Sequence, residues 1–411
     1  MPTMESTIPT PSATARMPQT IRRGTAHAPG RRWLPSAPRR NALGSVTGIP
    51  IVRGNARMGP SAKATIAGPC SIPLAMRGRT IHATIPAPAE ASWIAAKRSL
   101  CHAGPTVADS PIAGPSRKER SLTLALHWWR PLGNPRTAAG ELLRHGSAWA
   151  HAVRMGGAPL NFGDEASRVA LGELSGRPIR RSGIGSADVL GVGSILNRAW
   201  KAQPDATVFG SGLREPDHRP LPMAADRILA VRGTLTRDAL GLPSTQPLGD
   251  PALVVGDVYG GGPTIRKSAP LFIPHFTMLA ERAGRAHLSG IRARGWDVQL
   301  PTTTPLAVAE AIRSAPVVAT NSLHGVVFAH ALGTPVVAVD VAGHAEPDFK
   351  YDDYLSVFGL RHRPTDVTVV ADLSSAALID QVAAQTEIVR AALPALVTGL
   401  HRAAAPLRST S

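Results

Sequence analysis

A histidine stands at the start of a predicted helix in the segment 320–325, TNSLHG, and this loop carries the clearest chemistry of the chain. An apolar run, 316–319, leads into the loop; a helical pattern and a second apolar run, 336–340, follow it. This order predicts a βαβ unit. Anions collect at a helix start, because its first amides lack partners and the helix dipole is positive there. His324 is therefore predicted to handle a phosphate or a carboxylate at the strand ends, where open parallel sheets bind ligands.

Three further cationic or titratable side chains stand at predicted strand or helix ends. Arg232 has the fork geometry that clamps a carboxylate or a phosphate, and a solvated arginine is the alternative. His275 is interpreted equally well as a site residue and as a structural histidine bonded to the backbone. Lys350 either pairs with a phosphate or covers a helix face with its stem. His330, inside an apolar helix, is interpreted as a core histidine.

A turn with the sequence NFGD, 161–164, opens another predicted helix. Most carboxylates in such turns cap helices, but Asp164 lies at the mouth of a βα loop, where a base for a hydroxyl can stand. Two glycine loops, 191–194 and 210–212, do not meet the GxGxxG spacing, which argues against a dinucleotide site. No His/Asp/Glu cluster has metal-ligand spacing, so neither a metal nor a cofactor is predicted.

The positive charge of the chain is concentrated in its first part. The formal net charge is +17, and residues 1–120 hold 17 Lys/Arg and 4 Asp/Glu, so +13 lies there and +4 in the other 291 residues. This body lacks a polyanion-binding excess, which argues against nucleic acid as a partner. A modest positive balance suits a small anionic substrate.

Residues 1–120 also differ from the rest in composition, with 16 of the 38 prolines and no sustained period. They are predicted to be a disordered Arg/Pro/Ala-rich segment. An Arg-rich targeting peptide and an upstream stretch translated from a mis-assigned start are two other interpretations, and we favour the last. Both cysteines lie here, so no disulfide framework is expected in the body. No apolar run approaches the roughly 20 residues of a membrane span, and a cytoplasmic location is expected.

Strands and helices alternate from Ser121 onward, which predicts an α/β fold with parallel sheets. The predicted strands are short apolar runs: 122–129, 188–194, 206–212, 226–231, 269–273, 296–300, 316–319 and 336–340. The predicted helices are 166–174, a segment after 194, a segment after 212, one opening at 232–236, 278–294, 305–313, one after 324, 349–355 and 374–396. The glycine-rich segment 259–263 is the predicted hinge between a domain at 121–258 and a domain at 264–398.

Seven fragments together resemble the polysaccharide pyruvyl transferases. They are NFGD (161–164), GVGS (191–194), VRGTLT (231–236), GDPAL (249–253), IPH (273–275), SLHG (322–325) and KY (350–351). The SLHG variant is similar to the succinoglycan-type branch, the ketal-forming pyruvyl transferases of exopolysaccharide synthesis. The resemblance covers about residues 121–361, and the common order and strand-end placement of the fragments make the set specific.

The resemblance implies two Rossmann-like domains that face each other across a cleft, as in GT-B glycosyltransferases. It implies phosphoenolpyruvate as donor and co-substrate, and a glycan or lipid-linked oligosaccharide as acceptor. The implied donor-binding set is Arg232, His275, Ser322, Leu323, His324 and Lys350. Many members carry arginine where this chain has Ser322, so one cationic contact to the donor is either absent or supplied from elsewhere, with Lys350 and His275 as candidates.

In the reaction that the resemblance implies, protonation of the donor's methylene carbon makes its carbon 2 electrophilic. Two hydroxyls of one sugar then attack in turn, and phosphate leaves as a cyclic ketal closes. His324 is assigned as the proton donor or as a ligand of the leaving phosphate, because histidine can hold a proton near neutral pH. Asp164 is the candidate base, and Asn161 and Asp164 form the acceptor-binding set.

Two alternatives share this architecture. One is a GT-B-type glycosyltransferase that uses a nucleotide sugar, and the other is a non-catalytic glycan-binding relative, since a fold does not fix a function. The expected partners of the favoured reading are phosphoenolpyruvate and the glycan acceptor. Peripheral association with the inner face of a membrane, through a lipid-linked acceptor, is a further option.

Overall fold

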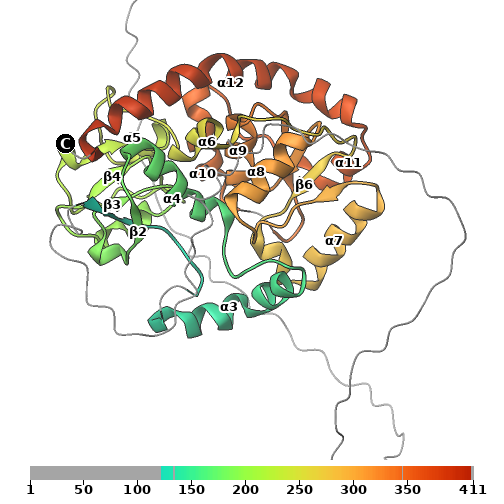
Figure 1. Cartoon of the computed structure of the whole chain (residues 1–411), viewed down its shortest axis with the longest axis horizontal. Coiled ribbons are helices and arrows are strands. Elements are labelled where there is room, and N and C mark those ends of the chain that lie inside the picture. Colours follow the sequence, from blue (N-terminus) through green and yellow to red (C-terminus); the bar gives the residue numbers. More distant parts are fainter. Residues whose placement is uncertain (1–121, 133–134, 345, 409–411) are drawn as a thin grey trace, which may run out of the picture. The chain divides into compact units, whose positions relative to one another are not determined.

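Two five-stranded parallel sheets, each flanked by helices, confirm the predicted α/β class (Figure 1). The computed structural model describes residues 122–132, 135–344 and 346–408, without the side chains of residues 135–137. All of these belong to one unit, residues 106–411. The predicted disordered segment, 1–120, lies outside the described residues.

The first sheet has the strand order β2-β1-β3-β4-β5. Its strands are β1 (Leu124–His127), β2 (Ile179–Arg181), β3 (Val189–Leu190), β4 (Thr207–Phe209) and β5 (Ile228–Ala230). The four strands predicted from apolar runs are present and are mostly buried, as expected for a parallel sheet covered on both faces. No prediction covered β2, because two of its three side chains are arginines; it lies at the edge of the sheet.

The helices of the first half are α3 (Pro135–Arg154), α4 (Phe162–Ser175), α5 (Thr234–Ala239) and α6 (Val255–Tyr259). Short 3₁₀ turns lie at η1 (Ile184–Ser186), η2 (Leu196–Lys201), η3 (Ala225–Arg227) and η4 (Pro251–Val254). The predicted helices after 194 and 212 were wrong: a six-residue 3₁₀ turn follows β3, and irregular chain follows β4. Prolines at 204, 216 and 220 disfavour longer helices there.

Helix α3 was not predicted, and it packs on the second half of the chain. The Ser147 hydroxyl donates a hydrogen bond to the Ala280 carbonyl at 2.9 Å. The ring of Trp149 stacks on Phe276, with centroids 5.3 Å apart. Glycines at 140 and 146 interrupt the apolar pattern that would have indicated this helix.

The second sheet has the strand order β10-β9-β8-β6-β7. Its strands are β6 (Leu271–Ile273), β7 (Asp297–Val298), β8 (Val318–Thr320), β9 (Val336–Asp340) and β10 (Thr365–Asp366). Strand β8 lies in the middle and pairs with β6 and β9. The predicted βαβ unit around His324 is therefore confirmed, and its first loop leaves the central strand of this sheet.

The helices of the second half are α7 (Arg282–Ala293), α8 (Pro305–Ser314), α9 (Leu323–Ala331), α10 (Asp348–Leu355), α11 (Val367–Ala371) and α12 (Ser375–Ala403). The 3₁₀ turns here are η5 (Phe276–Leu279), η6 (Ser356–Phe358) and η7 (Ala405–Leu407). Helix α7 begins four residues later than predicted, after the separate turn η5. Helix α12 starts where the Ser374 hydroxyl accepts a hydrogen bond from the Ala377 amide.

Helix α12 runs from the second half of the chain to the first (Figure 1). Near its end, the Leu400 side chain lies against Gly249, so close that a side chain at Gly249 would crowd it. The His401 ring contacts Asp257 at 3.1 Å. The boundaries 121–258 and 264–398 stay predictions, but the last turns of α12 pack with the first half.

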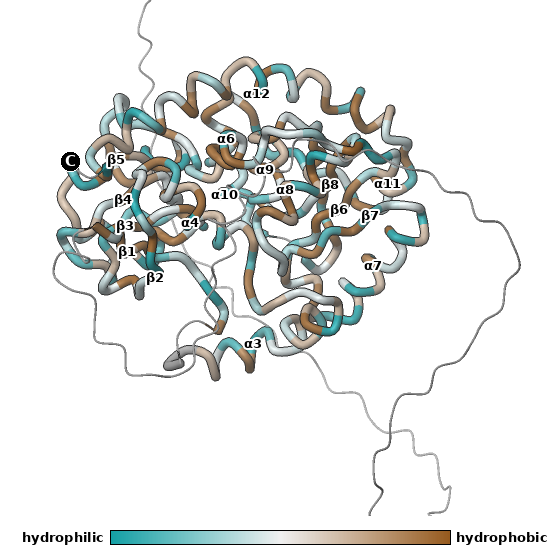
Figure 2. The backbone as a smooth tube through the Cα atoms, viewed as in Figure 1, coloured by the Kyte–Doolittle hydropathy of each residue, from teal (hydrophilic) through white to brown (hydrophobic). Residues whose placement is uncertain are grey.

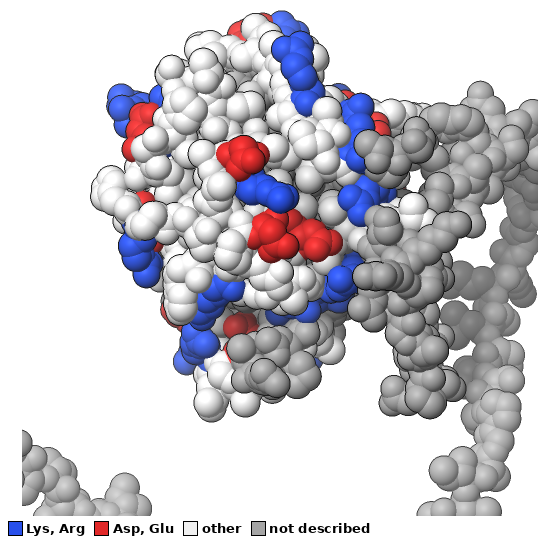
Figure 3. Space-filling view, turned by 90° about the vertical axis from the view of Figure 1, so that its left-hand side faces the viewer, with Lys and Arg blue, Asp and Glu red and all other residues white. Residues whose placement is uncertain are grey.

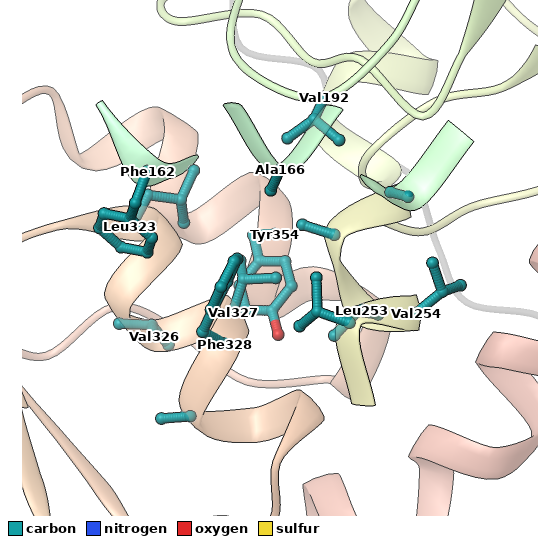
Figure 4. Packing of buried hydrophobic residues seen from close by; sticks show 14 of the residues in the cluster. Phe162, Ala166, Val192, Leu253, Val254, Leu323, Val326, Val327, Phe328 and Tyr354 are labelled. Atoms are coloured by element: carbon teal, nitrogen blue, oxygen red, sulfur yellow. The ribbon is translucent and has the colours of Figure 1, made fainter. Parts of the chain in front are cut away.

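A continuous apolar core joins the two halves. Apolar residues concentrate on the inner strands and on the inner faces of the helices (Figure 2). Phe162 of α4 packs edge-on against Phe328 of α9, with ring centroids 5.0 Å apart. Figure 4 shows Phe162 and Val192 from the first half around Val327, Phe328 and Tyr354 from the second. This core fixes the starts of α4 and α9 relative to each other, just behind the candidate site.

Candidate active site

The starts of α4 and α9 meet at the imidazole of His324. Asn161 caps α4 by accepting a hydrogen bond from the Gly163 amide at 3.4 Å, and His324 is the second residue of α9. A side chain at Gly163 would overlap the His324 ring, so glycine is required where the helix start touches the imidazole. Two helix starts thus lie beside one histidine, which concentrates positive potential there.

His324 is buried and electrically neutral in the free protein. Its side chain is 9% exposed, and its Nε2 atom has no hydrogen-bond partner among the described residues. Burial, followed by the charges of Lys350 and Arg232, lowers the pKa of His324 to about 3. A buried nitrogen without a partner is uncommon in native proteins and is one of the features expected where a ligand binds. The predicted role as proton donor stays a prediction, and it requires a bound anion that raises this pKa.

Asp164 lies next to the same helix start. The Asn161 amide donates a hydrogen bond to its Oδ2 atom at 2.7 Å, and a side chain at Gly193 would come within 3.3 Å of its Oδ1 atom. Burial raises the pKa of Asp164 to about 7, against the opposing hydrogen bond from Asn161. Near neutral pH this carboxyl can either hold or accept a proton, which is the range that general acid–base catalysis uses. The predicted pair Asn161 and Asp164 flanks Gly163, the position that borders the His324 ring.

Arg232 is fully buried and engaged by protein on all three nitrogens. Its Nε and Nη2 atoms contact Asp353 Oδ2 at 3.0 and 2.9 Å, Nη1 donates to the Ser194 hydroxyl at 2.6 Å, and Nη2 donates to the Leu213 carbonyl at 2.6 Å. Asp353 also accepts from the amide and the hydroxyl of Thr236, both at 2.7 Å. We call this the Arg232–Asp353 pair. It ties the loops after β3, β4 and β5 to α10.

A second ionic group lies at the same junction, and we call it the Glu346 cluster: Glu346, Lys350, Arg214 and His275. The Glu346 Oε2 atom lies 2.7 Å from Lys350 Nζ and 2.8 Å from Arg214 Nη1. His275 Nδ1 lies 3.7 Å from the other carboxylate oxygen. Burial lowers the pKa of Lys350, against the stabilising effect of Glu346. Sequence reasoning found Lys350 and His275 and missed the other two.

The loop before α9 is held rigidly. The Asn321 side chain accepts a hydrogen bond from the His275 amide at 2.6 Å, and the Tyr351 hydroxyl donates to the Asn321 carbonyl at 2.8 Å. Ser322 is buried and its side chain caps no helix amide. The Leu323 side chain belongs to the core near Phe162 (Figure 4), so it is already in contact with protein. The predicted donor role of Ser322 and Leu323 stays a prediction.

Two hollows lined by described residues lie elsewhere. One of about 380 Å³ is lined by α7 and α11, including His287 and Arg294. The other, of about 230 Å³, lies behind α10 and includes Tyr351 and His362. The chemistry points to His324 instead, because its Nε2 atom is buried without a partner among the described residues, and Asp164, whose pKa is raised, follows the Gly163 that borders the ring.

Three properties of the described residues limit the kinds of site present. They contain no group of three or more His, Cys, Asp or Glu side chains placed to hold a metal ion. Among the helices built from them, none has both the length and the apolar character that a membrane crossing needs. On the face shown in Figure 3, basic and acidic side chains are interspersed.

The fold is α/β, and His324 follows the carboxyl end of β8, the central strand of the second sheet, where open parallel sheets bind ligands. Residues 173–343 match the family model "Polysaccharide pyruvyl transferase". The matched stretch includes Arg214, Arg232, His275 and His324, whereas Asp164 lies outside it.

Two curated proteins are similar to the chain. The succinoglycan biosynthesis protein ExoV of Rhizobium meliloti (strain 1021) is 30% identical over 190 residues, which cover 44% of this chain and 57% of that protein. An uncharacterised protein of Acanthamoeba polyphaga mimivirus is 28% identical over 124 residues, 28% of this chain and 42% of that protein. The chain thus spans about half the length of the curated relatives it matches.

Proposed function

We propose that the chain transfers a pyruvyl group from phosphoenolpyruvate to a sugar of an exopolysaccharide or of its lipid-linked precursor, forming a pyruvate ketal. The family match and the similarity to a succinoglycan biosynthesis protein support the reaction class. The observation that carries the proposal is the orphaned Nε2 atom of buried His324, beside two helix starts and under the charge of Lys350. Such a centre suits a small donor that bears both a carboxylate and a phosphate.

The donor's charge is the first thing that the site must handle. Lys350 and Arg214 are the cations that this proposal assigns to the donor; the Lys350 ammonium is buried, and nearly half of the Arg214 side chain is exposed. They take the place of the arginine that many family members carry where this chain has Ser322. Arg232 acts in this proposal as a positioning residue, because its nitrogens already hold Ser194 and the Leu213 carbonyl.

The chemistry consumes one donor and two hydroxyls of one sugar. A proton adds to the donor's methylene carbon while the first hydroxyl oxygen bonds to carbon 2. The second hydroxyl oxygen then bonds to carbon 2 as the bond to the phosphate oxygen breaks. One hydroxyl proton balances the proton placed on carbon, and the other leaves with the phosphate. No oxidant or reductant is needed.

The ionisation states assign the protein groups to these steps. Asp164, with its pKa raised to about 7 by burial, accepts the proton of the attacking hydroxyl, and Asn161 orients the acceptor. A bound dianion raises the pKa of His324, so that the ring donates a proton to the methylene carbon or binds the leaving phosphate. The lipid-linked acceptor places this reaction at the cytoplasmic face of a membrane.

The test is incubation of the purified chain with phosphoenolpyruvate and candidate lipid-linked sugars. Release of phosphate together with a pyruvate mass increment on the sugar is the expected result. Thermal stabilisation by a nucleoside diphosphate, but not by phosphoenolpyruvate, would instead favour a nucleotide-sugar glycosyltransferase. Glycan binding without turnover would favour a non-catalytic relative.

A further inference from the structure

Glu346 carries a negative charge in the middle of a site that must receive an anion. Its carboxylate lies 2.8 Å from the Arg214 guanidinium and 2.7 Å from the Lys350 ammonium. Its side chain is 9% exposed, and that of Lys350 is 7% exposed. Glu346 therefore occupies the position where the two cations of the site converge.

The two cations come from opposite halves of the chain. Arg214 follows β4, and its amide is fixed by a hydrogen bond of 2.6 Å to the Asn197 side chain. Lys350 lies in α10, where its ammonium also sits 5.1 Å from the Tyr351 ring centre. An ammonium has three hydrogen-bond donors. Among the described residues, Glu346 accepts a hydrogen bond from the Lys350 ammonium. The remaining donors can meet a ligand.

The charge balance shows what Glu346 does in the free protein. Burial lowers the pKa of His275 to about 3, so this ring is neutral near neutral pH. Burial alone would raise the pKa of Glu346, but the basic groups around it, His275 first and then Lys350 and Arg214, lower this pKa to about 2. Two positive charges and one negative charge thus meet here. Removing the negative charge would leave two positive charges without a partner, which is a strong anion site.

We propose that Glu346 is an internal counter-anion, which in the free protein fills the position that an anionic group of the donor takes when it binds. This inference rests on the proposed function. Displacement of Glu346 sets the donor specificity, because a ligand must offer enough negative charge to replace a carboxylate already in place. A ligand with both a phosphate and a carboxylate meets this demand better than a ligand with one of them.

The experiment measures anion affinity in Glu346→Gln, which keeps the shape of the side chain and removes its charge. Binding of inorganic phosphate, pyruvate and phosphoenolpyruvate is measured by titration calorimetry at fixed ionic strength. We expect affinity for phosphoenolpyruvate to rise by about tenfold, the scale of one charge interaction near a protein surface. The phosphate and pyruvate arms show which donor group replaces Glu346. Unchanged or weaker affinity for all three ligands would overturn the proposal.

Two controls separate this effect from general charge and from folding. Glu387→Gln removes the carboxylate of an exposed ion pair with Arg390 in α12, and its anion affinity should equal that of the wild type. The double variant Arg214→Met/Glu346→Gln should lose the gain, because one of the two freed cations is gone. If Glu346→Gln does not fold, Glu346→Asp takes its place, because it moves the carboxylate away from the two cations by one methylene. Its affinity for phosphoenolpyruvate should rise by a smaller factor, about threefold. No rise in that affinity would also overturn the proposal.

The inference and the proposed function fail in different ways. A gain in phosphate affinity in Glu346→Gln, with no ketal formed by the wild type from any acceptor, would support the counter-anion and remove the pyruvyl transfer. Ketal formation by the wild type, with no gain in any anion affinity in the variant, would support the transfer and remove the counter-anion.

Discussion

The Arg232–Asp353 pair and the Glu346 cluster both join the two halves of the chain by charge, but they differ in exposure and in saturation. The side chains of Arg232 and Asp353 are fully buried and every arginine nitrogen is engaged. In the Glu346 cluster the Arg214 side chain is 46% exposed, and Lys350 retains free donors. In the buried pair every arginine nitrogen already bonds to a protein group, whereas a pair that reaches solvent can exchange its anion for a ligand more readily.

The largest expected effect is at His324, whose pKa is lowered by charges from both groups, Lys350 of the Glu346 cluster and Arg232 of the buried pair. His324→Ala should lower the rate of ketal formation by on the order of 10²–10⁴, the scale for losing a group that transfers a proton. The rate is measured as phosphate release with phosphoenolpyruvate and acceptor. His218→Ala, at an exposed ring bonded to the Ala239 carbonyl, is the control and should keep the wild-type rate. An unchanged rate in His324→Ala removes this residue from the chemistry.

The structural role of the Arg232–Asp353 pair is tested next. Arg232→Met leaves Asp353 buried without its cation, so the free energy of unfolding should fall by about 3–5 kcal/mol. Urea denaturation followed by circular dichroism measures this change. Arg219→Met breaks a surface pair with Asp217 and should leave the urea midpoint where it is in the wild type. Equal midpoints for both variants would break the comparison between the two charge groups.

A smaller, pH-dependent effect tests the acid beside His324. The pKa of Asp164, raised by burial from 3.8 to about 7, means that the folded protein keeps a proton that the unfolded chain releases between these values. The stabilising contribution of that proton is complete below about pH 4 and is lost as the pH rises toward 7. Asp164→Asn should therefore gain stability relative to the wild type over this window, by up to about 4 kcal/mol at the usual 1.4 per pH unit.

The measurement is urea denaturation of both proteins at several pH values from 4 to 8. Asp372→Asn, which removes an exposed carboxylate near Arg294, is the matched control and should run parallel to the wild type. A stability difference between Asp164→Asn and the wild type that does not change with pH would show that the carboxyl is ionised throughout.

Most of the fold could be predicted from the sequence, because parallel strands are local apolar runs. The strands that precede Arg232 and His324, β5 and β8, were of this kind. The failures also have local causes. Strand β2 has two arginines, and the turns after β3 and β4 were mistaken for helices although prolines follow.

The site could be predicted in part. His324 and Asp164 were found because each stands at a helix start, a position that sequence reveals. Asp353 was missed because its partner Arg232 lies 121 residues away, and no local pattern records that contact. Glu346 did carry a signal, its spacing of four residues from Lys350, but that spacing is common on exposed helices.

The most direct test of the account is calorimetric titration of phosphoenolpyruvate into Lys350→Met and Arg232→Lys, beside the wild type. Losing the hydrogen bonds of one charged group should weaken donor binding in Lys350→Met by about 10–100-fold. Arg232→Lys, measured under conditions where it is folded, should bind the donor within about threefold of the wild type, because Arg232 acts through the protein. Donor affinity lost in Arg232→Lys and kept in Lys350→Met would contradict the account.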